Sequence, residues 1–173
     1  FGAEREVYFA QEHPPGRQGL SDFTVADDLN IEITGAAFPH RLYQFAMANS
    51  GWRHAEVVPG GESFMALSQG LQAALWRLGG VPEEHRTDSF SAAFNNLAEA
   101  QELTRRYEDL CRHYGMRASR CNPGQSNENG SIESRHGSLK TALDQALRLR
   151  GSRAFDDRAG YDAFVEEIVG RFN

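Results

Sequence analysis

The segment Arg41–Ala48 (RLYQFAMA) limits the possible folds most, because it is apolar on both faces of an extended strand. A strand of that kind lies in the interior of a sheet, with a layer over each face. Two more strands are predicted beside it, over Gly19–Ala26 and Trp52–Val58, and residues 49–51 are typical of a turn. The first part of the chain is therefore predicted to be a meander of three antiparallel strands.

Apolar residues at helical spacing predict four helices in the rest of the chain. Their apolar stripes run over Phe64–Leu78, Leu103–Tyr114, Ile132–Leu147 and Tyr161–Phe172. The third helix is expected over Ser131–Leu149, after a polar, flexible loop at Cys121–Gly130, and Asp156 is expected to cap the fourth. The aromatic residues of these stripes, together with Trp52 and Trp76, are interpreted as core.

Short strands are predicted at His85–Asp88 and Met116–Arg120, each between two of the helices. Three meandering strands followed by alternating helices and strands predict an α/β fold. The sheet would be mixed, with five strands and with helices on both faces.

The length of 173 residues is that of one domain, and the chain opens at Phe1 rather than at Met. We therefore expect residues 1–173 to be a single domain taken from a longer protein. No apolar run approaches the ~18 residues that span a bilayer, so no membrane partner is expected. Cys111 and Cys121 lack C-x-x-C spacing, which favours reduced thiols in a cytosolic protein.

The formal net charge of −6 argues against a simple basic patch for phosphate groups. It leaves open an enzyme that reaches phosphates through bound metal ions. Lys140 is the only lysine, and all other basic residues are arginines.

Three acidic residues stand where chemistry is expected. Asp22 lies in the middle of a predicted strand, where a carboxylate is costly unless it is paired or binds a cation. Asp88 ends the predicted fourth strand, where open sheets place ligand sites, and Glu133 lies in the first turn of the predicted third helix. If the first and fourth strands are neighbours, the three carboxylates meet at one edge of the sheet.

Three convergent carboxylates repel one another unless they are protonated or hold a metal ion. Oxygen ligands with few histidines nearby favour Mg²⁺ or Mn²⁺, and two such ions ~3.5–4 Å apart suit displacement at phosphorus. Taken singly, each acid is better explained as a surface or capping carboxylate than as a metal ligand. Asp27, Asp28 and Glu128 are interpreted as solvated loop residues of this kind.

Three motifs add to this pattern. They are Ser21-Asp22-Phe23-Thr24, then Arg86-Thr87-Asp88-Ser89, then Asn129-Gly130-Ser131-Ile132-Glu133 with Leu139-Lys140 behind it. In this order they resemble the catalytic cores of integrases and transposases with a ribonuclease-H-like fold. The stretch from His13 to Leu149 resembles the core of IstA-type insertion-sequence transposases, most clearly in its QEHPPG, SDFT, FNNLAE, NGSIES and LRGSR segments.

The resemblance implies a ribonuclease-H-like sheet of three antiparallel strands followed by two parallel ones. It also implies a D-D-E triad of Asp22, Asp88 and Glu133 that is catalytic and binds two Mg²⁺ or Mn²⁺ ions. The implied activity is cleavage at transposon ends, followed by transfer of the 3′-hydroxyl into target DNA. Two departures stand out: Ser89-Phe90 replaces the usual Asn-Gly, and the segment between Asp88 and Glu133 is longer than in retroviral integrases.

Further residues are assigned by position on the third helix. Lys140 lies seven positions after Glu133, on nearly the same face, and is expected to contact a DNA phosphate; a surface lysine is the alternative. Arg135 is a second, weaker candidate for DNA contact. His136 falls on the apolar stripe and is interpreted as a packed core histidine.

The resemblance implies partners that lie outside these residues. They are DNA, as transposon ends and target, an ATPase helper protein of the AAA+ type, and further copies of the full-length protein. Flanking DNA-binding domains would supply the basic charge that this chain lacks, and the protein would act in the bacterial cytoplasm at the nucleoid. The alternatives are a nuclease or junction resolvase that only hydrolyses DNA, and a catalytically silent assembly domain.

Overall fold

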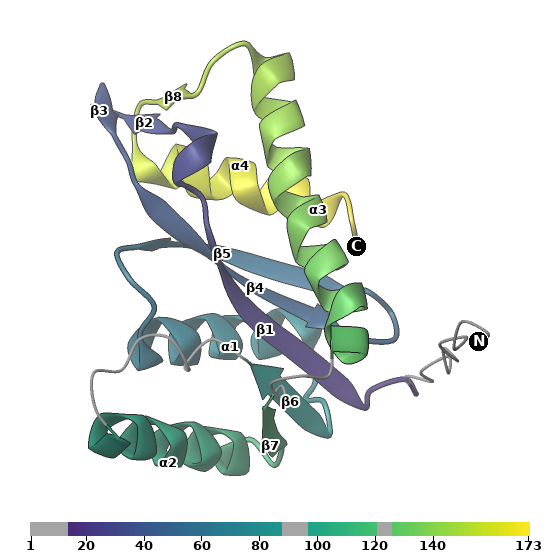
Figure 1. The fold of residues 1–173 in the computed structure, drawn as a ribbon. Coiled ribbons are helices and arrows are strands. Elements are labelled where there is room, and N and C mark those ends of the chain that lie inside the picture. The colour runs from purple at the N-terminus through teal and green to yellow at the C-terminus, as the bar shows by residue number, and fades with distance from the viewer. Residues whose placement is uncertain (1–13, 88–96, 121–125) are drawn as a thin grey trace, which may run out of the picture.

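The computed structural model describes residues 14–87, 97–120 and 126–173, with side chains described for these except at 97–98, 120 and 126–137. A five-stranded sheet lies at its centre (Figure 1). Its strands are β1 (Gln18–Val25), β4 (His40–Met47), β5 (Arg53–Pro59), β6 (Glu84–Thr87) and β7 (Arg117–Arg120), in the spatial order β5-β4-β1-β6-β7.

The sheet has an antiparallel half and a parallel half. Strand β4 pairs antiparallel with β5 and with β1, whereas β6 pairs parallel with β1 and with β7. The predicted fold class is confirmed: three antiparallel strands are followed by two parallel ones, and the first and fourth predicted strands are neighbours. Strand β4 is interior, as its two apolar faces predicted.

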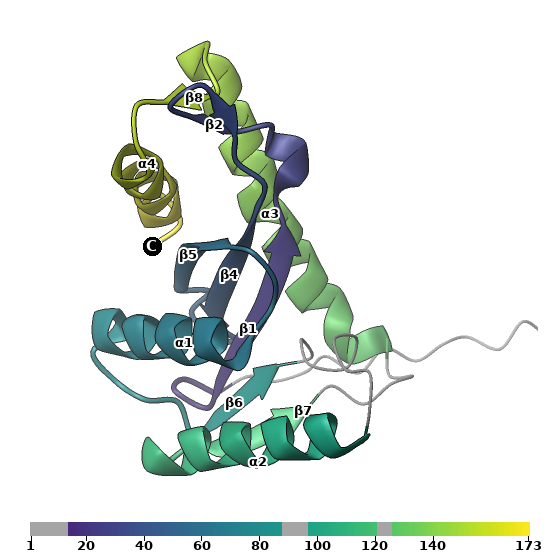
Figure 2. The same ribbon diagram turned by 90° about the vertical axis from the view of Figure 1, so that its left-hand side faces the viewer.

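Each face of the sheet has its own hydrophobic core, because alternate residues of one strand point to opposite faces. On β4, Tyr43 and Phe45 pack with residues of α1 (Phe64–Leu78) and α2 (Leu97–His113). Leu42 faces the other way, toward α3 (Ser126–Arg150) and α4 (Arg158–Gly170). Figure 2 shows α1 and α3 on opposite sides of the sheet.

A second, small sheet was not predicted. It consists of β2 (Glu32–Ile33), β3 (Ala36–Ala37) and β8 (Ala154–Phe155), in the order β3-β2-β8. A short 3-10 helix at Asp27–Leu29 leads into it from the end of β1. Strands of two residues have no periodicity to detect, and the pairing of β2 with β8 joins segments that are far apart in the sequence.

Helix α3 begins earlier than predicted. The prediction of a loop at Cys121–Gly130 is wrong for residues 126–130, because these residues are helical. Residues 121–125 lie outside the described part. Glycine and asparagine cost a helix at most ~1 kcal/mol each, and extension of an existing helix needs no new nucleus. Glu133 is therefore in the third turn of α3 rather than in its first turn.

Two smaller expectations are also wrong. Asp157, and not Asp156, caps α4: its Oδ1 accepts a hydrogen bond from the Gly160 N–H at 2.8 Å. Trp76 is not a core residue, because 82% of it is exposed, whereas Trp52 packs against the core shared by α1 and α2. Trp76 lies in the last turn of α1, on its exposed face next to the exposed Arg77.

We predict that Gly70→Ala destabilises the domain by about 1–3 kcal/mol, although alanine normally favours a helix. A Cβ atom at Gly70 would overlap the ring of Tyr43, so α1 would have to move away from β4. The free energy of unfolding in urea measures this effect.

Gly170→Ala in α4 is the matched control, because a Cβ atom there meets open space. It should leave stability unchanged or slightly raised. Equal effects of the two substitutions would contradict the close packing of α1 on Tyr43.

Candidate functional site

Asp22 lies on the middle strand of the five. It is opposite Gln44 of β4, and its neighbour Ser21 is opposite Thr87, the last residue of β6. Asp88 follows Thr87 directly in the sequence but lies outside the described residues. The structure thus brings the strand that carries Asp22 beside the strand that leads to Asp88.

The side chain of Asp22 is half-buried on the α3 side of the sheet. Its neighbour Phe23 belongs to the core under α1 and α2, and side chains alternate along a strand, so Asp22 faces the opposite way. One carboxylate oxygen, Oδ1, accepts a hydrogen bond from the Phe23 N–H at 2.7 Å.

A buried chain of hydrogen bonds lies directly under this position, on the other face. Ser21 Oγ lies 2.6 Å from the Tyr43 hydroxyl and 2.7 Å from Nε2 of His85. Nδ1 of His85 is 2.9 Å from the Tyr107 hydroxyl, which donates in turn to the His85 carbonyl oxygen at 2.8 Å. The four side chains join β1, β4, β6 and α2.

The direction of each hydrogen bond follows from the bond between Tyr107 and the His85 carbonyl, because a carbonyl oxygen can only accept. Because the Tyr107 O–H donates to the backbone carbonyl, its oxygen accepts the proton of His85 Nδ1. Nε2 then carries no proton and accepts from Ser21, whose oxygen accepts from Tyr43. This tautomer is neutral, in agreement with a pKa of His85 that burial lowers to about 3.

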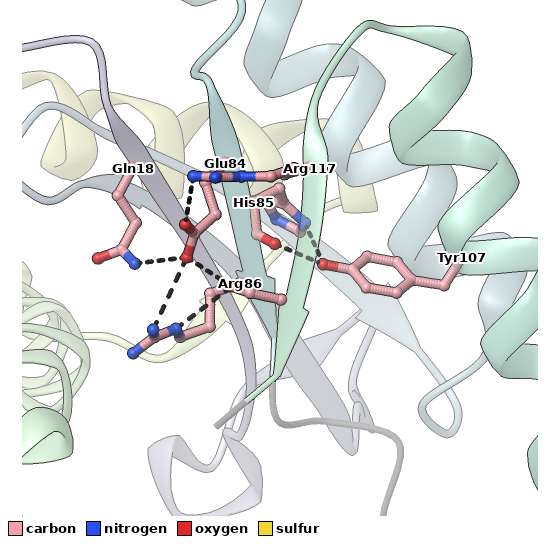
Figure 3. A network of polar contacts seen from close by, with 7 residues as sticks. Gln18, Glu84, His85, Arg86, Tyr107 and Arg117 are labelled. Carbon is pink, nitrogen blue, oxygen red and sulfur yellow. Dashed lines mark hydrogen bonds and ion pairs between the residues drawn. The ribbon is translucent and has the colours of Figure 1, made fainter. Parts of the chain in front are cut away.

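On the α3 side of β6, Glu84 is the centre of a second polar group. Its carboxylate accepts hydrogen bonds from Gln18 at 2.9 Å, Ser119 at 2.7 Å and Arg117 at 3.1 Å. Arg86 lies 3.7 Å away as an ion-pair partner. In Figure 3, Glu84 faces Gln18 and Arg86 while His85 faces Tyr107.

Burial tends to raise the pKa of the Glu84 carboxyl, but its partners outweigh that effect. The hydrogen bonds from Ser119 and Gln18 and the charges of Arg86 and Arg117 together leave the pKa below its usual value. Glu84 is therefore an anion that fixes two arginines on the same face of the sheet as Asp22.

Lys140 is the one predicted DNA contact whose side chain the structure describes. Its Nζ lies 2.7 Å from Oδ1 of Asp28 and 3.0 Å from the carbonyl oxygen of Val25, the last residue of β1. Asp28 is solvated, as expected, because its side chain is 64% exposed, but it also forms this ion pair, which its position in the sequence did not indicate. Asp27 also has a partner, because its Oδ1 accepts from the His40 N–H at 3.0 Å.

The other predicted residues are placed only in part. Glu133, Arg135 and His136 belong to α3, but their side chains lie outside the described part. Among the side chains that are described, no three of His, Cys, Asp and Glu gather into a metal-binding group. Two of the three predicted ligands are not in that set, so the triad itself stays a prediction.

Sequence reasoning missed the residues that hold the site in place. Ser21, His85 and Glu84 stand next to or within the motifs, yet nothing in their spacing indicates that they bond to Tyr43, Tyr107 or Arg117. A serine and a histidine within predicted strands are the only local signals, and each is also common on a strand that faces solvent.

Comparisons with known proteins give the fold a name. No family model matches the chain. An uncharacterized protein of Sinorhizobium fredii, y4jA/y4nE/y4sE, is 55% identical over 174 residues that make up 99% of this chain. The chain spans about a third of that relative's length, 34%.

Solved structures of integrases are similar to it. A simian T-cell lymphotropic virus intasome in complex with the PP2A regulatory subunit B56 gamma matches with a TM-score of 0.66 at 18% identity, over 94% of this chain and 50% of the other. The catalytic core domain of BIV integrase matches with a TM-score of 0.59 at 17% identity, over 89% and 81%.

The HTLV-2 integrase catalytic core domain in complex with magnesium, in a dimeric form, matches with a TM-score of 0.57 at 19% identity, over 90% of this chain and 84% of the other. The fold is that of an integrase catalytic core. This agrees with the ribonuclease-H-like class that the three motifs implied. Within residues 14–87, 97–120 and 126–173, no helix combines the length and the apolar character that crossing a bilayer requires.

We predict that His85 makes the domain less stable in acid. Its pKa is about 3 when folded against an ordinary value of 6.5, so the unfolded state takes up the proton first. The contribution of His85 to the free energy of unfolding is fully present above pH 6.5. It falls as the pH drops toward 3, by up to ~1.4 kcal/mol per pH unit.

Unfolding free energies of wild type and His85→Gln between pH 7 and pH 4 test this prediction. The variant should be less stable at pH 7 but should depend less steeply on pH. His113→Gln, which changes an exposed histidine of α2, is the control and should keep the wild-type slope. Parallel pH profiles for wild type and His85→Gln would contradict the assignment of a neutral His85.

Proposed function

We propose that this chain is the catalytic domain of an IstA-type DNA transposase, which cleaves transposon ends and joins the resulting 3′-hydroxyl to target DNA. The observation that carries the proposal is the pairing of β1 with β6 in a register that sets Ser21 opposite Thr87. The residue after each is an aspartate, Asp22 and Asp88. The integrase-core fold and the order of the three motifs support it.

Asp22, Asp88 and Glu133 are the residues that would hold two Mg²⁺ or Mn²⁺ ions. The donor set fits such ions, because all three are carboxylates and hard divalent cations prefer oxygen ligands. Asp22 is half-buried on the central strand, where a bound cation would offset the cost of removing a carboxylate from water. When bound, such ions activate the attacking oxygen and stabilise the leaving one.

The chain's own residues would hold the reacting groups in line. The Ser21–His85 bond fixes β1 against β6 at 2.7 Å, one residue before Asp22. Helix α3 crosses the same face of the sheet, where Leu139 and Leu143 anchor it in the core. Glu133 stands on this helix, so its reach toward Asp22 depends on the α3 backbone rather than on a free loop.

The wider setting is also part of the proposal. A chain with a net charge of −6 needs basic partners or flanking domains to hold DNA firmly, and the relative that it matches is about three times as long. We therefore propose flanking DNA-binding domains, an AAA+ ATPase helper, self-association of the full-length protein, and action at the nucleoid in the bacterial cytoplasm.

We predict that Asp22→Asn, Asp88→Asn and Glu133→Gln each abolish strand transfer while leaving the fold intact or slightly more stable. Loss of one charge removes a metal ligand and also relieves repulsion between carboxylates in the metal-free protein. The measurement is the joining of a labelled duplex, ending in the terminal sequence of the encoding element, to a second duplex in Mg²⁺ or Mn²⁺.

Asp109→Asn and Glu167→Gln are matched controls, because both acids are exposed on α2 and α4 and form ion pairs with arginines there. They should keep full activity, and circular dichroism should show the same fold for all five variants. An active Asp88→Asn protein would overturn the triad, and nicking without joining by the wild type would assign a hydrolytic nuclease instead.

A further inference from the structure

Lys140 links α3 to β1 and to the 3-10 helix that follows it, through a hydrogen bond to Val25 and an ion pair with Asp28. Val25, whose carbonyl oxygen also contacts Lys140, ends the strand that holds Asp22 three residues earlier. Lys140 lies on α3, seven residues after Glu133. The ammonium group is therefore fixed at the end of β1, on the edge of the proposed site.

Asp28 occupies a hydrogen-bonding position on the Lys140 ammonium group. The distance of 2.7 Å between Nζ and Oδ1 is that of a charge-assisted hydrogen bond, and a phosphate oxygen is an acceptor of the same charge and similar geometry. Lys140 is the only lysine of the chain. A phosphate that approaches Lys140 must displace this carboxylate or be repelled by it.

The pair is weak enough to be displaced. The Asp28 side chain is 64% exposed and that of Lys140 is 28% exposed, and ion pairs in such positions contribute little to the stability of a fold. The neighbouring Asp27 is held elsewhere, because its Oδ1 accepts a hydrogen bond from the His40 N–H at 3.0 Å. Asp28 makes no other hydrogen bond with its side chain in the described part of the chain.

We propose that Asp28 is an internal counter-ion that competes with DNA phosphate for Lys140 and so limits how tightly the domain holds DNA. The inference rests on the proposed function, since it assigns DNA as the ligand of Lys140. Asp28 is then a positioning residue. It orients the Lys140 side chain at the edge of the site and lowers the affinity of the domain for DNA.

Affinity for a duplex of unrelated sequence tests the proposal, measured with the full chain in EDTA over a series of salt concentrations. Asp28→Asn should bind about three- to tenfold more tightly than wild type at low salt. The slope of log K against log salt should steepen by up to ~0.9, the value for one added phosphate contact. Asp109→Asn, which removes one negative charge of similar exposure on α2, should change both quantities much less.

Lys140→Gln completes a double-mutant cycle. In that background, Asp28→Asn should have no more effect than Asp109→Asn, because the lysine for which Asp28 competes is gone. Equal effects of Asp28→Asn with and without Lys140 would overturn the proposal. So would weaker binding by Asp28→Asn in the wild-type background, or no duplex binding by either protein at the lowest salt.

This experiment separates the inference from the proposed function, because binding in EDTA requires neither metal nor catalysis. If strand transfer is normal but the two substitutions show no coupling in DNA affinity, only the role of Asp28 is disproved. If the triad variants are active but Asp28→Asn and Lys140→Gln are coupled in DNA affinity, only the transposase mechanism is disproved.

Discussion

The hydrogen-bond chain from Tyr43 through Ser21 and His85 to Tyr107 is the interaction on which the arrangement of the domain depends. It crosses the junction where the antiparallel half of the sheet meets the parallel half, and it is fully enclosed, with His85 0% exposed. Buried polar groups are costly unless every one has a partner, so the alternatives to this register are unfavourable. This set of hydrogen bonds therefore favours one alignment of β1 with β6.

That alignment explains why a carboxylate is tolerated at Asp22. Residues on the α1 and α2 side of β1 contribute to the core and to the buried hydrogen bonds, whereas the α3 side carries polar groups across three strands. Gln18, Glu84, Arg86, Arg117 and Ser119 lie on that side, beside the strand that holds Asp22. The α3 face is thus divided: over β4 and β5 it carries a hydrophobic core, and over β6 and β7 it carries the charged groups next to which chemistry is proposed.

Several parts of this arrangement were predictable. The strand at β4, the helix at α1 and the order of strands and helices follow from periodicity, because burial against a sheet leaves an apolar pattern in the sequence. Other parts left no such pattern. The sheet β3-β2-β8 is made of two-residue strands, the start of α3 runs through SNENG, and the ion pair between Lys140 and Asp28 joins residues that are far apart in the sequence.

The sequence by itself determined the fold class and identified Asp22, Asp88, Glu133 and Lys140 as candidate site residues. Both depend on residue types and on their order along the chain. Only the tertiary structure decided that Ser21 bonds to His85, that Glu84 holds Arg117, and that Lys140 is paired with Asp28. These choices depend on which side chains the register and the helix packing bring within about 3 Å, the distance of a hydrogen bond. Such proximity is a property of the folded chain, and residue spacing along the sequence does not contain it.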